Sequence, residues 1–156
     1  MKSLTLLRHA KTERESASGR DFDRQLNERG RRDAVRMGEE MRKLALEFDS
    51  CLCSPANRAA ETAQLAGLKP EFDERIYDAS ASDLLAIARE SADSAARLLM
   101  IGHNPGFERL ASQLIAATIE MPTGSLIEIE LGIDRWRDVE IGRGRLVRFI
   151  KPKELR

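Results

Sequence analysis

The chain contains only two histidines, and each follows a short apolar run. His9 lies in "LTLLRHAKTE" and His103 in "RLLMIGHNPGF". Runs of this length are typical of buried strands. The carboxyl ends of parallel strands meet at one edge of a sheet, and ligands bind there. The spacing therefore predicts that both imidazoles lie at the same sheet edge.

A third segment of the same form follows the run "SCLCS", where Pro55 leads toward Arg58. Together the three segments supply two imidazoles, the guanidiniums of Arg8 and Arg58, and N–H groups at helix N-termini. Guanidiniums and helix N-termini bind anions, and phosphate suits both. This set predicts an anion site, although a histidine at a strand end or an arginine early in a helix also occurs as a structural or solvated group.

The two histidines suit different roles at a phosphate site. A neutral imidazole is a competent nucleophile toward phosphorus. Arginines nearby disfavour the imidazolium and are expected to keep such a nucleophile neutral near pH 7. The same guanidiniums then hold the phosphoryl oxygens during transfer. A second histidine, protonated against the phosphate, would stabilise the charge, and no step of this scheme needs a metal or another cofactor.

Strand and helix patterns alternate along the chain, which favours an α/β layered fold with a mainly parallel sheet. The sequence predicts strands at 4–7, 50–54, 71–72, 97–101, 125–131 and 145–150, of which the last two are expected at sheet edges. Helices are predicted from Asn27 to about 46, from Ser54-Pro55 to about 66, from Ser82 to about 90, and onward from Asn104-Pro105. No repeat or linker divides residues 1–156, so a single domain is expected.

Bulk composition excludes several classes. The 156 residues carry 26 basic and 26 acidic side chains, so no global positive field for nucleic acid is expected. No apolar stretch approaches the roughly 20 residues of a membrane span, and the first residues make a poor signal peptide. A cytoplasmic protein is expected. Cys51 and Cys53 are interpreted as core thiols, with a zinc module as a remote alternative.

Several motifs resemble one known family. "LLRHAKTE" resembles the Arg-His signature of the histidine phosphatase superfamily, with Ala10 in place of its usual Gly. "SPANRAAETA" resembles that superfamily's Ser-Pro-x-x-Arg helix start, and "GHNPG", "DRQLNERG" and "PTGSLIEIEL" resemble its SixA-type phosphohistidine phosphatase branch. The resemblance implies a phosphoglycerate-mutase-like three-layer α/β/α sandwich.

The resemblance also implies roles for five residues. His9 becomes the phospho-acceptor, and Arg8 and Arg58 become phosphate ligands. His103 becomes the electrostatic stabiliser, and the backbone N–H of Asn104 contributes at the pocket. The implied enzyme uses neither metal nor cofactor.

Two further assignments have plain alternatives. Arg24 in "DRQLNERG" matches a basic residue that lines the pocket, or it is a loop arginine paired with Asp21 or Asp23. Glu74 in "DERIYDA" matches the proton donor of mutase-like relatives, or it is a solvated charge, and Asp78 is a weaker candidate for donor.

The expected function is therefore a phosphatase that works through a phosphohistidine intermediate, with phosphohistidine on a protein as its substrate. A P–N bond demands a weaker acid than an alkyl phosphate does, and the chain has little room for a lid. The alternatives are a phosphatase of small phosphoesters such as sugar phosphates or nucleotides, and a non-catalytic phosphate-binding regulatory module. A mutase is disfavoured because it needs a closed, water-poor site.

Overall fold

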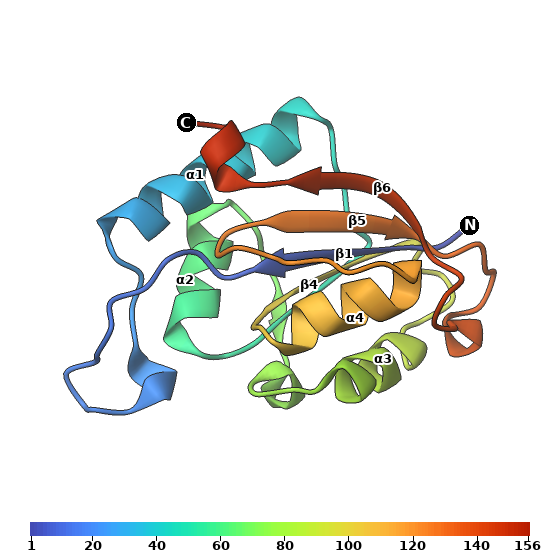
Figure 1. Ribbon diagram of the computed structural model, residues 1–156, viewed down its shortest axis with the longest axis horizontal. Helices are drawn as coiled ribbons and strands as arrows, with labels where there is room; N and C mark the ends of the chain where they lie inside the picture. Colours follow the sequence, from blue (N-terminus) through green and yellow to red (C-terminus); the bar gives the residue numbers. More distant parts are fainter.

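The computed structural model describes residues 1–156, which form one six-stranded sheet (Figure 1). The strands are β1 (Ser3–Arg8), β2 (Ser50–Cys53), β3 (Glu71–Phe72), β4 (Arg97–Gly102), β5 (Leu126–Glu130) and β6 (Arg145–Ile150). Their order is β3-β2-β4-β1-β5-β6, with parallel pairing from β3 to β1 and antiparallel pairing of β5 with both neighbours. The predicted mainly parallel sheet is confirmed.

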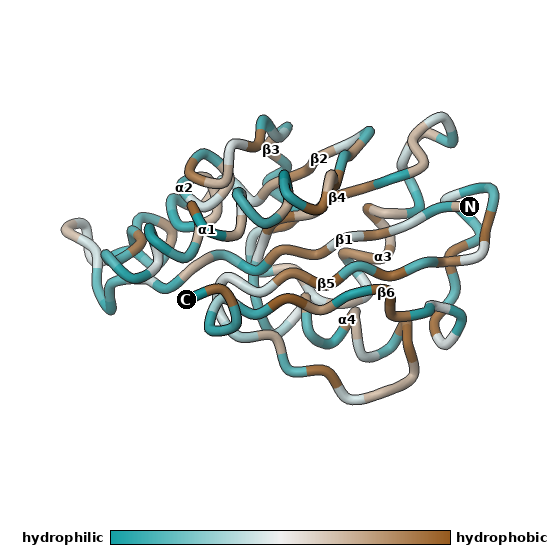
Figure 2. The backbone as a smooth tube through the Cα atoms, turned by 90° about the horizontal axis from the view of Figure 1, so that it is seen from above, coloured by the Kyte–Doolittle hydropathy of each residue, from teal (hydrophilic) through white to brown (hydrophobic).

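Helices cover both faces of the sheet (Figure 1). They are α1 (Glu28–Lys43), α2 (Asn57–Leu65), α3 (Ala81–Arg89) and α4 (Gly106–Ile115), joined by the 3-10 helices η1 (Asp21–Asp23), η2 (Glu74–Ile76), η3 (Trp136–Asp138) and η4 (Pro152–Glu154). Alternate residues of β4 divide the core, because Leu99 and Ile101 pack with α1 and α2 while Leu98 and Met100 pack with α3 and α4. Figure 2 shows hydrophobic residues along the sheet and hydrophilic ones along much of α1. No helix is long and apolar enough to cross a membrane.

Helix α1 begins where the sequence predicts, whereas its end and the start of α3 differ from the prediction. Asn27 caps α1 as predicted, since its side chain accepts a hydrogen bond from Gly30 N. The helix ends at Lys43 because the chain turns into the left-handed region at Ala45, with φ of 54°. Ser80 rather than Ser82 caps α3, through a capping box with Asp83.

The prediction that β5 is an edge strand is wrong, because β5 lies between β1 and β6. The polar side chains of its alternating pattern pair with side chains of the neighbouring strand on the same face of the sheet. Glu128 pairs with Arg148 of β6 at 2.8 Å, and Glu130 pairs with Arg145. Cross-strand ion pairs therefore account for the period-two pattern of an interior strand.

The strand order places three chain segments at one edge of the sheet. β2, β4 and β1 are neighbours and parallel, so the residues that follow them emerge side by side. Arg8 pairs with Gly102 in the register of β1 and β4, and Cys53 pairs with Ile101 in that of β2 and β4. The predicted convergence of these three strand ends is confirmed.

Candidate active site

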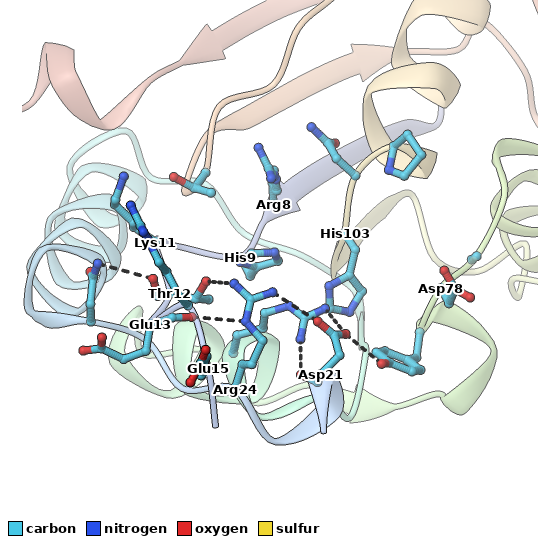
Figure 3. Close-up of a pocket in the computed structure, with 18 residues that line it drawn as sticks. Arg8, His9, Lys11, Thr12, Glu13, Glu15, Asp21, Arg24, Asp78 and His103 are labelled. Carbon is cyan, nitrogen blue, oxygen red and sulfur yellow. Dashed lines mark hydrogen bonds and ion pairs between the residues drawn. The ribbon is translucent and has the colours of Figure 1, made fainter. Parts of the chain in front are cut away.

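The two histidines lie next to each other beyond the carboxyl ends of β1 and β4. His9 N donates a hydrogen bond to Gly102 O, which extends the strand register by one residue. The two imidazole ring centroids are 5.3 Å apart and the ring planes are tilted by 52°. Each residue is only 7% exposed. Figure 3 shows both rings together with Arg8 above the side chains of Asp21 and Arg24.

One hydrogen bond fixes the tautomer of His9. Its Nδ1 lies 2.8 Å from the carbonyl oxygen of Ala10. A carbonyl oxygen can only accept, so Nδ1 carries the proton and Nε2 keeps a free lone pair. The pKa of His9 is lowered to about 3, mainly by burial, with smaller contributions from His103, Arg58 and Arg8. The imidazole is therefore neutral at pH 7, and burial contributes more to this than the arginines expected from the sequence.

His103 is held by the junction between β2 and α2. Its Nε2 is hydrogen-bonded to Ser54 Oγ at 2.7 Å, and Ser54 Oγ also accepts a bond from Ala56 N. Burial and then Arg58 lower the pKa of His103 to about 4, while Asp21 opposes that effect. The ring is therefore neutral in the free pocket, and the expected protonation against the phosphate requires the negative charge of the bound anion.

Ser54 thus differs from its predicted role as the N-cap of a helix beginning at Pro55. The helix α2 begins at Asn57, and its N-cap residue Ala56 makes no side-chain capping bond. This start places Arg58 in the first turn, where its guanidinium donates to Asp21. Ser54 links the strand end to the second histidine instead of capping the helix.

The two signature arginines are each held by backbone oxygens. Arg8 Nη1 donates to Met121 O at 2.8 Å, and Arg58 Nη1 donates to Asp21 O at 2.8 Å. Arg58 is 7% exposed, and its Nη2 also donates to Asp21 Oδ2 at 2.9 Å. These bonds fix two guanidiniums beside the imidazoles, as phosphate coordination requires.

Asp21 is the centre of a polar network that the sequence analysis did not assign to the site. Its carboxylate accepts hydrogen bonds from Arg58, from Arg24 Nη1 at 3.1 Å and from Tyr77 OH at 2.8 Å. Burial raises the pKa of Asp21, but the bonds from Tyr77, Arg24 and Arg58 outweigh burial and lower this pKa to about 2. Asp21 is therefore ionised at neutral pH. The pairing of Arg24 with an aspartate in this loop was the only sequence signal of the network.

These side chains line a polar cleft of about 1060 Å³, in which only two of 18 lining residues are hydrophobic. The predicted residues Arg8, His9, Arg24, Arg58, His103 and Asn104 all line it. Glu74 does not line the cleft; it is exposed at the start of η2, whereas Asp78 does line it. The structure also adds residues without a predicted role, among them Lys11, Thr12, Glu13, Asp21, Tyr77 and Thr123.

Asn104 organises the cleft through its side chain. Asn104 Nδ2 donates to Met121 O at 2.9 Å and to Glu108 Oε2 at 2.9 Å. Met121 N donates to the same carboxylate oxygen of Glu108 at 3.0 Å. The Met121 carbonyl oxygen thus receives both Arg8 and Asn104, and Glu108 on α4 fixes the backbone that carries it.

Ala10, the departure from the Arg-His-Gly signature, has a structural reason. The residue is fully buried and packs with Leu26 and Ala34. Its N donates to Thr62 Oγ1 at 3.0 Å, and Thr62 Oγ1 donates to Arg58 O at 2.7 Å. Its φ is not positive, so the position does not need glycine. The methyl group fills a small apolar cluster beside the site.

Three buried nitrogens around the cleft have no hydrogen-bond partner: Arg8 Nε, Arg58 Nε and His103 Nδ1. Buried polar atoms are rarely unpaired in folded proteins. All three belong to residues that line the cleft. Their concentration here indicates a site arranged for a ligand rich in hydrogen-bond acceptors, as a phosphate is.

The cysteines do not form part of a metal-binding cluster. Cys53 is buried and Cys51 half-buried in β2, and burial raises the pKa of the Cys51 thiol to about 12. No group of three or more His, Cys, Asp or Glu side chains in the chain is arranged to hold a metal ion. Both thiols lie in or against the core beneath α1 and α2, as the sequence suggested.

Comparison with known proteins decides the family. Residues 4–104 match the family model of the histidine phosphatase superfamily, branch 1. The chain belongs to this superfamily. An uncharacterized protein of Mycobacterium tuberculosis is 31% identical over 94% of the chain and 100% of its own length.

Solved structures of other superfamily members share the fold. A chain from Nakamurella multipartitia assigned as phosphohistidine phosphatase SixA superposes with a TM-score of 0.87 at 22% identity, covering 97% of this chain and 96% of that one. A chain from Agrobacterium tumefaciens with the same assignment gives a TM-score of 0.82 at 26% identity, covering 97% and 98%. The phosphoglycerate-mutase-like fold and the resemblance to the SixA branch are confirmed.

Proposed function

We propose that this histidine phosphatase superfamily member removes phosphate from phosphohistidine on a protein, through a covalent intermediate on His9. The observation that carries the proposal is the bond from His9 Nδ1 to Ala10 O at 2.8 Å. This bond leaves Nε2 unprotonated in a cleft lined by Arg8, Arg58 and His103. A neutral, oriented imidazole between phosphate-binding groups is what nucleophilic attack on phosphorus requires.

The reaction has two displacements. His9 Nε2 forms a bond to phosphorus as the substrate's P–N bond breaks, and the departing imidazole keeps the proton on its other ring nitrogen. Water then attacks the phosphorus on His9, the new P–N bond breaks, and inorganic phosphate leaves. Arg8 and Arg58 hold the phosphoryl oxygens in both steps. The negative charge of the bound phosphate raises the pKa of His103, which takes up a proton from solvent and stabilises the same oxygens.

Neither Glu74 nor Asp21 is suited to act as the acid that a P–O ester needs, which favours a P–N substrate. An alkoxide leaving group needs a proton from an acid, whereas a protonated phosphohistidine ring departs as neutral imidazole. Glu74, the donor expected from the sequence, lies outside the cleft, and Asp21 is ionised with a pKa of about 2. The structural likeness to chains assigned as SixA phosphohistidine phosphatases supports the same substrate class.

A phosphatase of small phosphoesters is the second candidate. The presence of the Asp78 carboxylate in the cleft favours it. This carboxylate lines the cleft and sits at a left-handed backbone position, with φ of 56°. Asp78 is the group that would protonate an ester oxygen. An Asp78→Asn variant that loses turnover of a phosphoserine peptide, whose alkoxide leaving group needs a proton, but keeps turnover of phosphohistidine separates the two activities.

The proposal is tested by phosphate release in the presence of EDTA from three substrates: free phosphohistidine, a phosphohistidine peptide and para-nitrophenyl phosphate. Faster turnover of the two P–N substrates is expected. Release from the ester alone would contradict the phosphohistidine assignment. Phosphate binding without release from any substrate would indicate a regulatory module instead.

The covalent step has its own test, because the chain has only two histidines. With His103→Ala, any acid-labile, base-stable phosphoenzyme must be on His9. With His9→Ala, this species and the turnover are both expected to disappear. Full activity of His9→Ala would refute the covalent scheme.

A further inference from the structure

Two smaller hollows that adjoin the active cleft differ in the sign of their charge, although the formal net charge of the chain is zero. One of them is a cleft of about 130 Å³, here called the basic cleft, with no carboxylate among its lining residues. Its lining consists of Lys11, Arg29, Pro122, Thr123, Lys151, Pro152, Lys153 and Arg156. Lys11 and Thr123 also line the active cleft, so the two adjoin. In Figure 3, Lys11 extends away from His103.

Most cations of the basic cleft lack a partner within the chain. Lys11, Arg29 and Lys153 are exposed and take part in none of the ion pairs of the structure. Lys151 lies over the Phe149 ring, 5.0 Å from its centroid. Arg156 is the exception, because it pairs with Asp33. The free cations come from three separate segments: the loop after β1, the start of α1, and η4, which packs against α1 (Figure 1).

A second hollow that adjoins the active cleft has the reverse charge. A hollow of about 340 Å³, here called the acidic hollow, is lined by Glu13, Glu15 and Asp23 and by no lysine or arginine. Glu13 and Glu15 also line the active cleft. A ligand that extends from the phosphate site into the basic cleft meets positive charge, whereas one that extends into the acidic hollow meets negative charge.

We propose that the basic cleft docks an acidic segment of the phosphorylated polypeptide and so sets the direction in which the substrate lies across the active cleft. This inference rests on the proposed function and adds a substrate class to it. A uniform polyanion such as nucleic acid fits poorly, because the part that passes the acidic hollow would be repelled. A small metabolite confined to the active cleft has no atoms to place against Arg29 or Lys153, whereas a polypeptide does.

Exposed charges act mainly by steering association and fixing register. The basic cleft is therefore expected to raise kcat/KM for acidic substrates and to leave kcat unchanged. The effect should weaken with salt, because the Debye length falls to about 8 Å at physiological ionic strength.

The test uses three peptides that carry one phosphohistidine and differ only in a flanking run of glutamate, serine or lysine. At low ionic strength we expect kcat/KM for the glutamate peptide to exceed that for the serine peptide by about 10-fold, with the lysine peptide lowest. Equal kcat/KM for the glutamate and serine peptides would overturn the proposal.

Two variants locate the effect. Arg29→Glu with Lys153→Glu should abolish the preference for the glutamate peptide and leave turnover of free phosphohistidine unchanged. The matched control is Lys69→Glu with Arg137→Glu, a pair of exposed residues that line none of the clefts named here. This control should keep the preference, and a preference that survives in the first variant would contradict docking at the basic cleft.

The same charge series on phosphoserine peptides separates this inference from the proposed function. If only phosphoserine peptides are cleaved, the phosphohistidine assignment fails, and a glutamate preference among them still supports docking. If phosphohistidine peptides are cleaved without a charge preference, the assignment stands and docking fails. Inhibition by single-stranded DNA that matches inhibition by the unphosphorylated glutamate peptide would also count against a polypeptide-specific site.

Discussion

At the scale of single residues, burial determines the charge state of the site. Both imidazoles are neutral because burial disfavours their charged form, and neighbouring arginines lower their pKa values further. Asp21 behaves oppositely, since hydrogen bonds from Tyr77, Arg24 and Arg58 keep it ionised despite partial burial. The cleft therefore combines a neutral nucleophile, fixed cations and one fixed anion at neutral pH.

The lowered pKa of His9 predicts a pH-dependent stability. The unfolded imidazole takes up a proton below about pH 6.5, whereas the folded one stays neutral down to a pKa of about 3. Stability from this group is thus complete above pH 6.5 and decreases as the pH falls, by up to about 1.4 kcal/mol per pH unit. Urea denaturation of wild type and His9→Gln between about pH 7.5 and 5 checks this. The variant should lose less stability on acidification, and parallel losses would contradict a buried neutral His9.

Asp21→Asn tests the fixed anion. The amide keeps a similar shape but removes the negative charge beside Arg58, so inorganic phosphate should bind about 3- to 10-fold more tightly. Isothermal titration calorimetry measures the dissociation constant. Asp138→Asn, an exposed carboxylate on η3, serves as the control and should not change it. Weaker phosphate binding to Asp21→Asn would show that positioning of Arg58 outweighs the removed charge.

At the scale of elements, the ends of β1, β2 and β4 are joined by side chains rather than by backbone alone. Thr62 on α2 accepts from Ala10 N and donates to Arg58 O, which joins the end of β1 to the start of α2. Ser54 joins the end of β2 to His103 after β4. These two hydroxyls hold the nucleophile, the arginine and the second histidine in one arrangement.

Thr62→Val is expected to lower the free energy of unfolding by about 1–3 kcal/mol. The valine has the same shape, but it leaves the buried Ala10 N–H without an acceptor. Chemical denaturation gives the stability, and kcat/KM should fall with it because Ala10 adjoins His9. Thr62→Ser keeps the hydroxyl and should recover most of kcat/KM. Thr118→Val, at an exposed position, should change stability by less than about 0.5 kcal/mol; an equal loss there would point away from the buried bond.

At the scale of the whole molecule, the cleft and Trp136 lie at opposite ends of the parallel strands. The cleft lies beyond the carboxyl ends, whereas Trp136 is bonded to Ala95, just before the start of β4. Trp136 is the only tryptophan, is fully buried in the core beneath α3 and α4, and donates from Nε1 to Ala95 O at 2.7 Å. Its fluorescence therefore reports global unfolding, and a ligand at the distant cleft acts on it only by stabilising the folded state.

Phosphate at about 100 times its dissociation constant should raise the free energy of unfolding by about 2.7 kcal/mol. The emission spectrum of the folded protein should stay unchanged, because the ligand does not reach the far end. Urea titration followed by Trp136 fluorescence measures both quantities. Arg58→Ala at the same phosphate concentration should be stabilised less. A spectral shift on adding phosphate without unfolding would mean that the cleft and the far end move together.

The predictable part of the fold followed from local patterns. The runs that became β1, β2 and β4, the Asn27 cap of α1 and the strand at Glu71–Phe72 were all evident from residue type and spacing. The cap at Ser80 and the start of α2 at Asn57 were missed, because several residues near a helix start are compatible with the N-cap position and packing selects among them. The interior place of β5 was missed because ion pairs to β6 produce the same alternation as a solvated face.

The sequence by itself determined that His9, Arg8, Arg58 and His103 follow strands or begin helices, and parallel pairing of neighbouring strands then brings them to one edge. Only the tertiary structure decided which carboxylates join them. Ile76 is buried in the core, and the turn around it leaves Glu74 exposed while Tyr77 and Asp78 line the cleft. Asp21, at the start of η1, pairs with Arg58, although the two residues are 37 positions apart in the sequence. Such contacts depend on how loops cross the sheet edge, which local propensity does not encode, whereas strand ends are fixed by hydrophobic burial that the sequence records directly.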